Sequence, residues 1–183
     1  MKPVRITYYV HGTTTDNEKG LASGWHDCSL SKLGKEQSIQ LGELIKARKR
    51  DAVYCSDLRR AVESAKLTYG DMVPIFQDRR LREINYGQFT QSESKKVDSL
   101  ILSHIEKPFP KGESYMDVEA RMRDFLDDIA GKYAGKRVDM VAHRAPQLCL
   151  DVILKGKTWE QAVKEDWRNR KAWQPGWEYK LGK

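Results

Sequence analysis

Apolar and polar positions follow two periods along the chain, and each period predicts one kind of element. Short runs rich in β-branched and aromatic residues predict strands, and longer segments with an apolar residue every three or four positions predict helices. The predicted strands cover residues 3–10, 51–56, 72–77 and 137–143, and the alternation of Trp177, Tyr179 and Leu181 predicts a final edge strand.

The predicted helices carry recognisable start signals. Ser31 is a candidate N-cap for the first of them, in which Leu33 and Leu44 belong to an apolar stripe at helical spacing. Ser114 and Asp117 resemble a capping box at the start of the clearest helix. The predicted helices lie within residues 29–50, 57–69, 114–135, 145–156 and 158–169.

Strands and helices alternate through most of the chain, which has no internal repeat. This order predicts an α/β fold with a parallel or mostly parallel sheet covered on both faces. The length fits a single domain over residues 1–183. Ligands of such sheets bind just beyond the carboxyl ends of the strands, so the residues at those ends are the first candidates for function.

Three strand ends carry residues suited to one phosphoryl group. His11 ends the first strand, Arg59 and Arg60 follow the second, and His143 ends the fourth. A guanidinium is a planar fork for phosphate oxygens, a neutral imidazole can attack phosphorus, and a second imidazole can stabilise the charge that develops. Each residue alone has a simpler interpretation as a structural or surface group. Their coincidence at one sheet edge favours a site.

The residues around these strand ends resemble the histidine phosphatase superfamily, in its phosphoglycerate mutase-like branch. The signature of that branch reads Arg-His-Gly-Glu-Thr, two further residues and Asn, and here "VHGTTTDN" stands at residues 10–17. "CSDLRRAVESA" resembles the family's Ser-Ser-Asp-Leu-x-Arg-Ala block, which assigns the phosphate arginine to Arg60. "RLREINYGQF" resembles the block that carries the acid, and "VAHRAP" stands where the family has its second His-Gly.

The resemblance implies a three-layer α/β/α sandwich and a phosphohistidine mechanism that needs no metal and no cofactor. His11 would attack phosphorus, Glu83 would protonate the leaving group, and water would then hydrolyse the intermediate. Arg60, His143 and Asn17 would hold the phosphoryl oxygens. The remaining candidates are Gly12 and Arg144 for the phosphate and Ser23, Gly24 and Tyr86 for the rest of the substrate.

Two of these residues have structural alternatives on sequence alone. Asn17 could cap or turn its loop, and its six-residue spacing from His11 favours a place in the site. Glu83 stands among arginines in "DRRLREINYG" and could be an ordinary salt-bridge partner; only the family pattern favours the acid role.

Two departures from the family pattern bear on activity. The arginine before the nucleophile is Val10 here, and the glycine after the second histidine is Arg144. A lost charged hydrogen bond costs about 1.5–3 kcal/mol, which would slow the enzyme without abolishing its mechanism. One hypothesis is that Arg144 partly replaces the missing guanidinium, and the alternative is that Arg144 points to solvent. The alternatives to a phosphatase are a phosphoglycerate mutase and a non-catalytic phosphate-binding regulatory module.

Composition narrows the possible partners. The net charge of +7 favours anionic ligands, but no basic helix or aromatic–basic interleaving indicates nucleic acid. The mean hydropathy of −0.71 and the lack of a long apolar run predict no membrane association. Three cysteines without a CxxC pair fit a reducing compartment, so we expect a cytoplasmic protein acting on a small phosphorylated substrate.

Overall fold

The computed structural model describes residues 2–170 and 176–182, which form one five-stranded sheet with helices on both faces. The strand order is β3-β2-β4-β1-β5, and all strands run parallel except β5, which pairs antiparallel with β1. The strands are β1 (Val4–Val10), β2 (Ala52–Cys55), β3 (Ile75–Gln77), β4 (Arg137–Ala142) and β5 (Trp177–Leu181). The expected mostly parallel sheet with a final edge strand is therefore confirmed.

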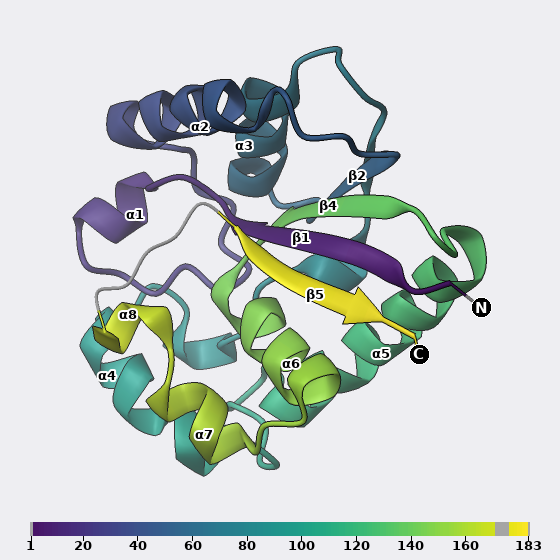
Figure 1. The fold of residues 1–183 in the computed structure, drawn as a ribbon. Coiled ribbons are helices and arrows are strands. Elements are labelled where there is room, and N and C mark those ends of the chain that lie inside the picture. The colour runs from purple at the N-terminus through teal and green to yellow at the C-terminus, as the bar shows by residue number, and fades with distance from the viewer. Residues whose placement is uncertain (1, 171–175, 183) are drawn as a thin grey trace.

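Helices cover both faces of the sheet. Figure 1 shows that α2 and α3 lie on one face and that α5 and α6 lie on the other. The expected three-layer α/β/α sandwich is confirmed. The α-helices are α1 (Thr15–Glu18), α2 (Lys32–Ile45), α3 (Arg59–Tyr69), α4 (Ser94–Leu100), α5 (Tyr115–Lys132), α6 (Arg144–Lys155), α7 (Trp159–Lys164) and α8 (Trp167–Arg170). The helix expected over residues 158–169 is thus two helices, α7 and α8. None of the helices in the described residues is long and apolar enough to span a bilayer.

Each face of the sheet has its own core. The larger core lies under α5 and α6, where Met122, Phe125 and Leu148 pack against strand residues such as Val138 and Met140. The smaller core lies under α2 and α3 and includes Tyr9, Val53 and Tyr69. The three cysteines are buried and free. A pocket lined by Val10 and His11 lies at the carboxyl end of β1, the edge where ligands of such sheets bind.

Helix α2 packs largely through small residues, and the expected apolar stripe is confirmed at Leu30, Leu41 and Ile45 but is wrong at Leu33 and Leu44. Leu33 and Leu44 are 49% and 65% exposed, and the buried face of α2 is formed by Gly34, Ser38, Gly42 and Ile45. A Cβ atom on Gly34 would lie 1.9 Å from the carbonyl oxygen of Thr13. The missing side chains let α2 approach the loop after β1, and this close approach helps to fix the position of that loop.

The region between β3 and α5 is irregular, as the sequence indicates. It contains the 3₁₀ turns η1 (Arg79–Leu81), η2 (Gly87–Phe89) and η3 (Ile101–His104) together with α4. Ser114 and Asp117 form the expected capping box at the start of α5, and Ser31 caps α2 through the backbone N–H of Gly34.

Candidate active site

Adjacent parallel strands bring the two histidines together. The register of β1 on β4 pairs Val10 with Ala142, and the backbone N–H of His11 donates to the carbonyl of Ala142 at 3.1 Å. The next residue on each strand is therefore a histidine at the same edge. The ring centroids of His11 and His143 lie 5.0 Å apart, as the strand-end argument predicts.

His11 presents an unprotonated ring nitrogen to the pocket. Its Nδ1 lies 2.7 Å from the carbonyl oxygen of Gly12, which can only accept, so Nδ1 carries the proton. The other nitrogen, Nε2, then has a lone pair, toward which the Nε of Arg60 donates at 3.3 Å. Burial and the charge of Arg60 lower the pKa of His11 to about 3. His11 is therefore neutral at physiological pH and has a free nucleophilic nitrogen.

Arg60 is fixed by the backbone of another loop. It stands near the start of α3 and is buried, with only 2% of its surface exposed. Its two terminal nitrogens donate to the carbonyls of His26 at 3.0 Å and Gly24 at 2.7 Å. A guanidinium has five N–H donors. The two carbonyl contacts and the contact with His11 Nε2 use three of them. The remaining two are available to phosphoryl oxygens.

His143 has two buried ring nitrogens without a partner among the described residues. Burial, Arg60 and His11 hold its pKa well below the ordinary value, so the ring is neutral in the unliganded site. Its backbone is fixed by Tyr8, whose hydroxyl donates to the His143 carbonyl at 2.6 Å and accepts from the His143 N–H at 2.9 Å. An unpartnered buried imidazole is costly unless a ligand completes its hydrogen bonds, and an anion beside it would also raise its pKa.

Glu83 is positioned by backbone groups and is not an ordinary salt-bridge partner. Its Oε1 accepts from the N–H groups of Ile84 at 2.9 Å and Ala145 at 3.0 Å, and its Oε2 accepts from the N–H of Arg144 at 3.2 Å. Two of these donors belong to the first turn of α6, directly after His143. The carboxyl group is thus tied to the strand end that carries the second histidine, and Oε2 keeps free acceptor capacity toward the pocket.

The loop after His11 serves both structure and site. The N–H of Gly12 donates to the hydroxyl of Ser64 at 2.9 Å. Asn17 completes a capping box with Thr14: its Oδ1 accepts from the Thr14 N–H at 3.1 Å. Asn17 also lines the pocket with His11, and since Oδ1 is used by the cap, its amide N–H₂ is the group that can serve a ligand. The two interpretations of Asn17 are therefore compatible.

Arg144 matches neither of the two alternatives considered from the sequence. Its guanidinium does not point to solvent, because the side chain is only 6% exposed. Its charge is directed at carboxylates: Nε pairs with Asp166 and Nη1 pairs with Asp98. A guanidinium neutralised by two carboxylates is a poor phosphate ligand, so this geometry disfavours the expected phosphate role of Arg144.

The candidates for binding the rest of the substrate lie beside Arg60. Ser23, Gly24 and Tyr86 line a narrow part of the pocket together with His11 and Arg60. Gly24 has a φ of 51°, and a Cβ atom there would lie 3.0 Å from the Tyr86 ring, so the position requires glycine. Tyr86 itself is 6% exposed and packs on Phe109, so it is mainly part of the core.

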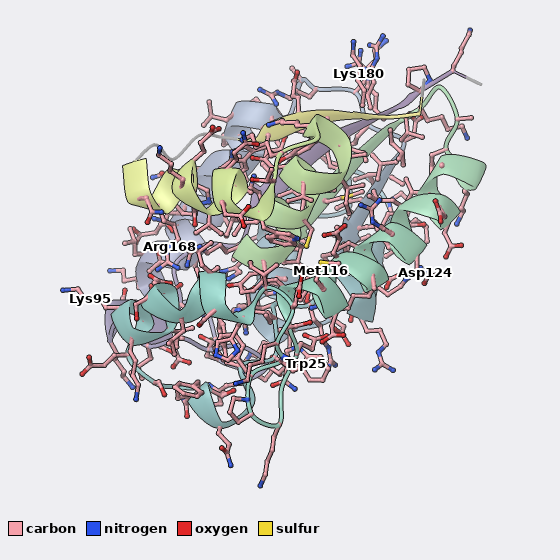
Figure 2. The ribbon with its side chains drawn as sticks, turned by 90° about the horizontal axis from the view of Figure 1, so that it is seen from below. Trp25, Lys95, Met116, Asp124, Arg168 and Lys180 are labelled. Atoms are coloured by element: carbon pink, nitrogen blue, oxygen red, sulfur yellow. The ribbon has the colours of Figure 1, made fainter. Side chains whose placement is uncertain are left out.

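The pocket has a volume of about 860 Å³ and two walls that differ in origin. We call His11, Arg60, Glu83 and His143 the inner wall: His11 and Glu83 line this pocket, Arg60 lines its narrow part, and His143 is buried with its ring 5.0 Å from that of His11. The outer wall consists of Lys19, Lys95, Asp98 and Arg168, from α4, α8 and the end of α1. Figure 2 shows that Lys95 and Arg168 lie on the same side of the molecule. None of these four outer-wall residues is among the candidates expected from the sequence.

Among the described residues, one group of side chains could together hold a metal ion. Its ligand atoms, from Asp16, His26 and Cys28, lie within 4.8 Å of one another. In the structure these groups bond to one another and to their neighbours: Nδ1 of His26 lies 3.0 Å from Asp16, and the Cys28 thiol donates to Ser23. The group contains none of the inner-wall residues.

These features define a class of site. A neutral imidazole with a free nitrogen, a buried guanidinium and an unpartnered buried imidazole surround one point at the carboxyl edge of an α/β/α sandwich. This arrangement can bind an anionic tetrahedral group and attack its centre, with a carboxyl group nearby for proton transfer.

Comparisons with known proteins agree with this class. The family model of the histidine phosphatase superfamily, branch 1, matches residues 9–173. "Putative phosphoserine phosphatase 2" of Hydrogenobacter thermophilus is 31% identical, with the alignment covering 83% of this chain and 79% of that protein. "Metal-independent phosphoserine phosphatase" of Arabidopsis thaliana is 29% identical over 73% of this chain and 61% of that protein.

A solved structure shows the same relation. The mycobacterial glucosyl-3-phosphoglycerate phosphatase is 26% identical, with a TM-score of 0.75 over 89% of this chain and 84% of that one. The chain belongs to the histidine phosphatase superfamily, branch 1. It is a phosphoric monoester hydrolase of the histidine phosphatase type, as the resemblance in its motifs implies.

Proposed function

We propose that the protein hydrolyses small phosphomonoesters through a phosphohistidine on Nε2 of His11. The observation that carries the proposal is the state of the two histidines. The His11 Nδ1 proton is held by the Gly12 carbonyl, so Nε2 is unprotonated and contacts only Arg60 among the described residues, where both buried nitrogens of His143 lack partners. A phosphoryl group between them would accept the hydrogen bonds that this site can offer.

In the first step, the lone pair of His11 Nε2 forms a bond to phosphorus, and the bond from phosphorus to the leaving oxygen breaks. Glu83 gives its carboxyl proton to that oxygen, so the product leaves as a neutral alcohol. Arg60 donates to the phosphoryl oxygens from a position fixed by the Gly24 and His26 carbonyls. Asn17 adds an amide N–H at the same point.

In the second step, water attacks the phosphorus of the phosphohistidine. Glu83 accepts the proton from the water, the bond from phosphorus to Nε2 breaks, and inorganic phosphate leaves. His143 is neutral in the unliganded site, and the charge of the bound phosphoryl group favours its protonated form. Protonated His143 would then stabilise the charge on the transferring group.

The substrate is proposed to be small and polar. The pocket volume of about 860 Å³ suits a metabolite-sized molecule. Its outer wall carries charges of both signs, with Lys19 and Lys95 beside Glu93 and Asp98. A substrate with both a carboxylate and an ammonium group would complement such a wall. The names of two relatives make phosphoserine the first compound to test.

The experiment is a phosphatase screen in the presence of EDTA, with p-nitrophenyl phosphate and a panel of phosphorylated metabolites. His11→Ala should abolish turnover and the acid-labile, base-stable phosphoryl label on the protein. The matched control is His104→Ala, because His104 stacks on Phe109 outside the pocket. Loss of turnover in the first variant alone supports the proposal.

Other outcomes identify the alternatives. Wild-type turnover in His11→Ala would refute the covalent mechanism. Binding of phosphate without turnover of any compound would indicate a regulatory module. Transfer of the phosphoryl group between phosphoglycerates faster than to water would indicate a mutase.

A further inference from the structure

The pocket lacks one cation that the family signature places beside the nucleophile. Val10 occupies that position and lines the pocket. The arginines that line the pocket among the described residues are Arg60, Arg144 and Arg168. Arg60 corresponds to a different arginine of the family pattern, and the charge of Arg144 is neutralised by Asp98 and Asp166. Arg168 is therefore the guanidinium to examine as the substitute.

Arg168 reaches the same space as the nucleophile. It lines the outer part of the pocket with Val10 and His11, and also the narrow part with Arg60 and Asn17. Its charge is close enough to contribute to the lowering of the pKa of His11. Its side chain is 38% exposed, so it can move toward a ligand. Figure 2 shows Arg168 labelled beside α8.

The start of α8 is held by Arg144. Asp166 is fully buried and accepts from the backbone N–H of Arg168 at 2.9 Å through Oδ1. The other carboxylate oxygen of Asp166 pairs with the Nε of Arg144. Arg144 directly follows His143, so one chain of contacts runs from the second histidine through Asp166 to the backbone of Arg168.

Among the described residues, the Arg168 guanidinium makes one ion pair, which is weak. Its Nη1 lies 3.8 Å from Oδ1 of Asp98, and that same oxygen also pairs with Arg144. A half-exposed ion pair at this distance contributes little stability. A phosphoryl group with two negative charges and three terminal oxygens is a stronger partner for a guanidinium fork.

We propose that Arg168 is a phosphate-binding residue that supplies, from α8, the guanidinium that this chain lacks at position 10. Arg144 is a positioning residue: it anchors Asp166 and thereby places Arg168 over the pocket. Together the two assignments account for Val10 in place of the family's arginine and for Arg144 in place of the family's glycine. The inference rests on the proposed function, in which His11 and its neighbours bind a phosphoryl group.

The test measures the affinity for vanadate and inorganic phosphate by calorimetry, beside kcat/KM for p-nitrophenyl phosphate. Arg168→Ala should weaken anion binding by about tenfold to a hundredfold, the usual effect of one charged hydrogen bond. Arg168→Lys should recover only part of the loss, because an ammonium cannot bind two oxygens as a fork. The matched control is Arg137→Ala, which removes an exposed arginine at the opposite end of the sheet.

Two further variants separate binding from positioning. Val10→Arg should restore most of the affinity in the Arg168→Ala background and add little to the wild type, since both guanidinium groups would serve one phosphate. Arg144→Met should weaken binding in the wild type but have little further effect in Arg168→Ala. If Arg144→Met does not fold, the Val10→Arg rescue still decides the role of Arg168.

The proposal fails if Arg168→Ala binds vanadate within about twofold of Arg137→Ala, a change of about 0.4 kcal/mol. The assignment of Arg144 fails if the losses from Arg144→Met and Arg168→Ala are additive, because Arg144 would then contact the phosphate itself. Either result would still leave the wild type with turnover and with the phosphoryl label on His11. Failure of the proposed function would instead appear in the wild type, as absence of turnover and of the label.

Discussion

The inner and outer walls of the pocket are held in different ways. Inner-wall side chains are fixed mainly by backbone groups: Glu83 accepts from three N–H groups, and Arg60 donates to two carbonyls. Outer-wall side chains are held by other side chains, as in the 3.8 Å contact between Arg168 and Asp98. Lys95 is exposed where it lines the pocket.

This difference separates chemistry from recognition. Backbone contacts at strand ends are set by the sheet register, so the inner wall is rigid and cannot adapt to different substrates. Contacts between side chains of short helices can change with few substitutions and rearrange at low cost. The inner wall therefore suits the phosphoryl step common to a family, and the outer wall suits the choice of substrate.

The largest effect expected from the inner wall concerns proton transfer. Glu83→Gln keeps one acceptor oxygen for the N–H groups of Ile84 and Ala145, loses the second acceptor used by the Arg144 N–H, and cannot donate a carboxyl proton. With alkyl phosphates, whose leaving group needs that proton, turnover should fall by about 10²–10⁴-fold. With p-nitrophenyl phosphate, whose leaving group needs little help, the loss should be about tenfold or less. Equal losses on both substrates would remove Glu83 from the acid role.

The next effect tests whether close packing fixes the inner wall. Gly34→Ala places a Cβ atom 1.9 Å from the Thr13 carbonyl, a backbone group that cannot turn away. The loop after His11 must shift, and we expect a loss of about 2–3 kcal/mol in the free energy of unfolding together with reduced kcat/KM. The matched control is Gly131→Ala, since nothing lies within 4 Å of its Cβ position.

The control should gain about 0.5–1 kcal/mol, because alanine is favoured over glycine inside a helix. Urea unfolding of both variants measures the two values. If Gly34→Ala were as stable and as active as the wild type, the contact between α2 and the loop would not be what fixes the nucleophile.

Much of the fold and of the inner wall could be predicted from the sequence. Apolar periodicity marks the strands, and the strand-end rule places His11 and His143 beside the pair Arg59 and Arg60 because the parallel strands end at one edge. The choice of Arg60 over Arg59 came from the family pattern. Glu83 needed the family pattern, because its backbone donors come from residues 144 and 145, far along the chain.

The outer wall could not be predicted because it depends on pairs between distant side chains. Nothing local indicates that Arg144 meets Asp98 and Asp166, which stand 46 and 22 residues away. The exposure of Leu33 and Leu44 has a related reason: leucines at helical spacing suggest a buried stripe, but the approach of α2 to Thr13 and Thr68 requires the face that carries Gly34 and Gly42. Close backbone contact leaves no apolar signal in the sequence.

The smallest expected effect concerns the charge state of the inner wall. The pKa of His143 is held well below its ordinary value of 6.5 in the folded protein, mainly by burial. Below about pH 6.5 the unfolded chain therefore binds a proton that the folded protein does not, so the free energy of unfolding falls as pH falls. The slope from one such group reaches about 1.4 kcal/mol per pH unit. His11, with a pKa of about 3, contributes in the same direction.

Urea unfolding at several values between about pH 6.5 and pH 5.5 measures this slope. His143→Gln should flatten it, because the variant has no imidazole to protonate in the unfolded chain. Saturating vanadate should also flatten the wild-type slope, since an anion beside His143 raises the pKa of the folded state toward that of the unfolded chain. A wild-type slope that neither change reduces would mean that His143 is not held neutral by the pocket. The inner wall would then be charged before substrate binds, and His143 would stabilise the bound phosphoryl group from the start.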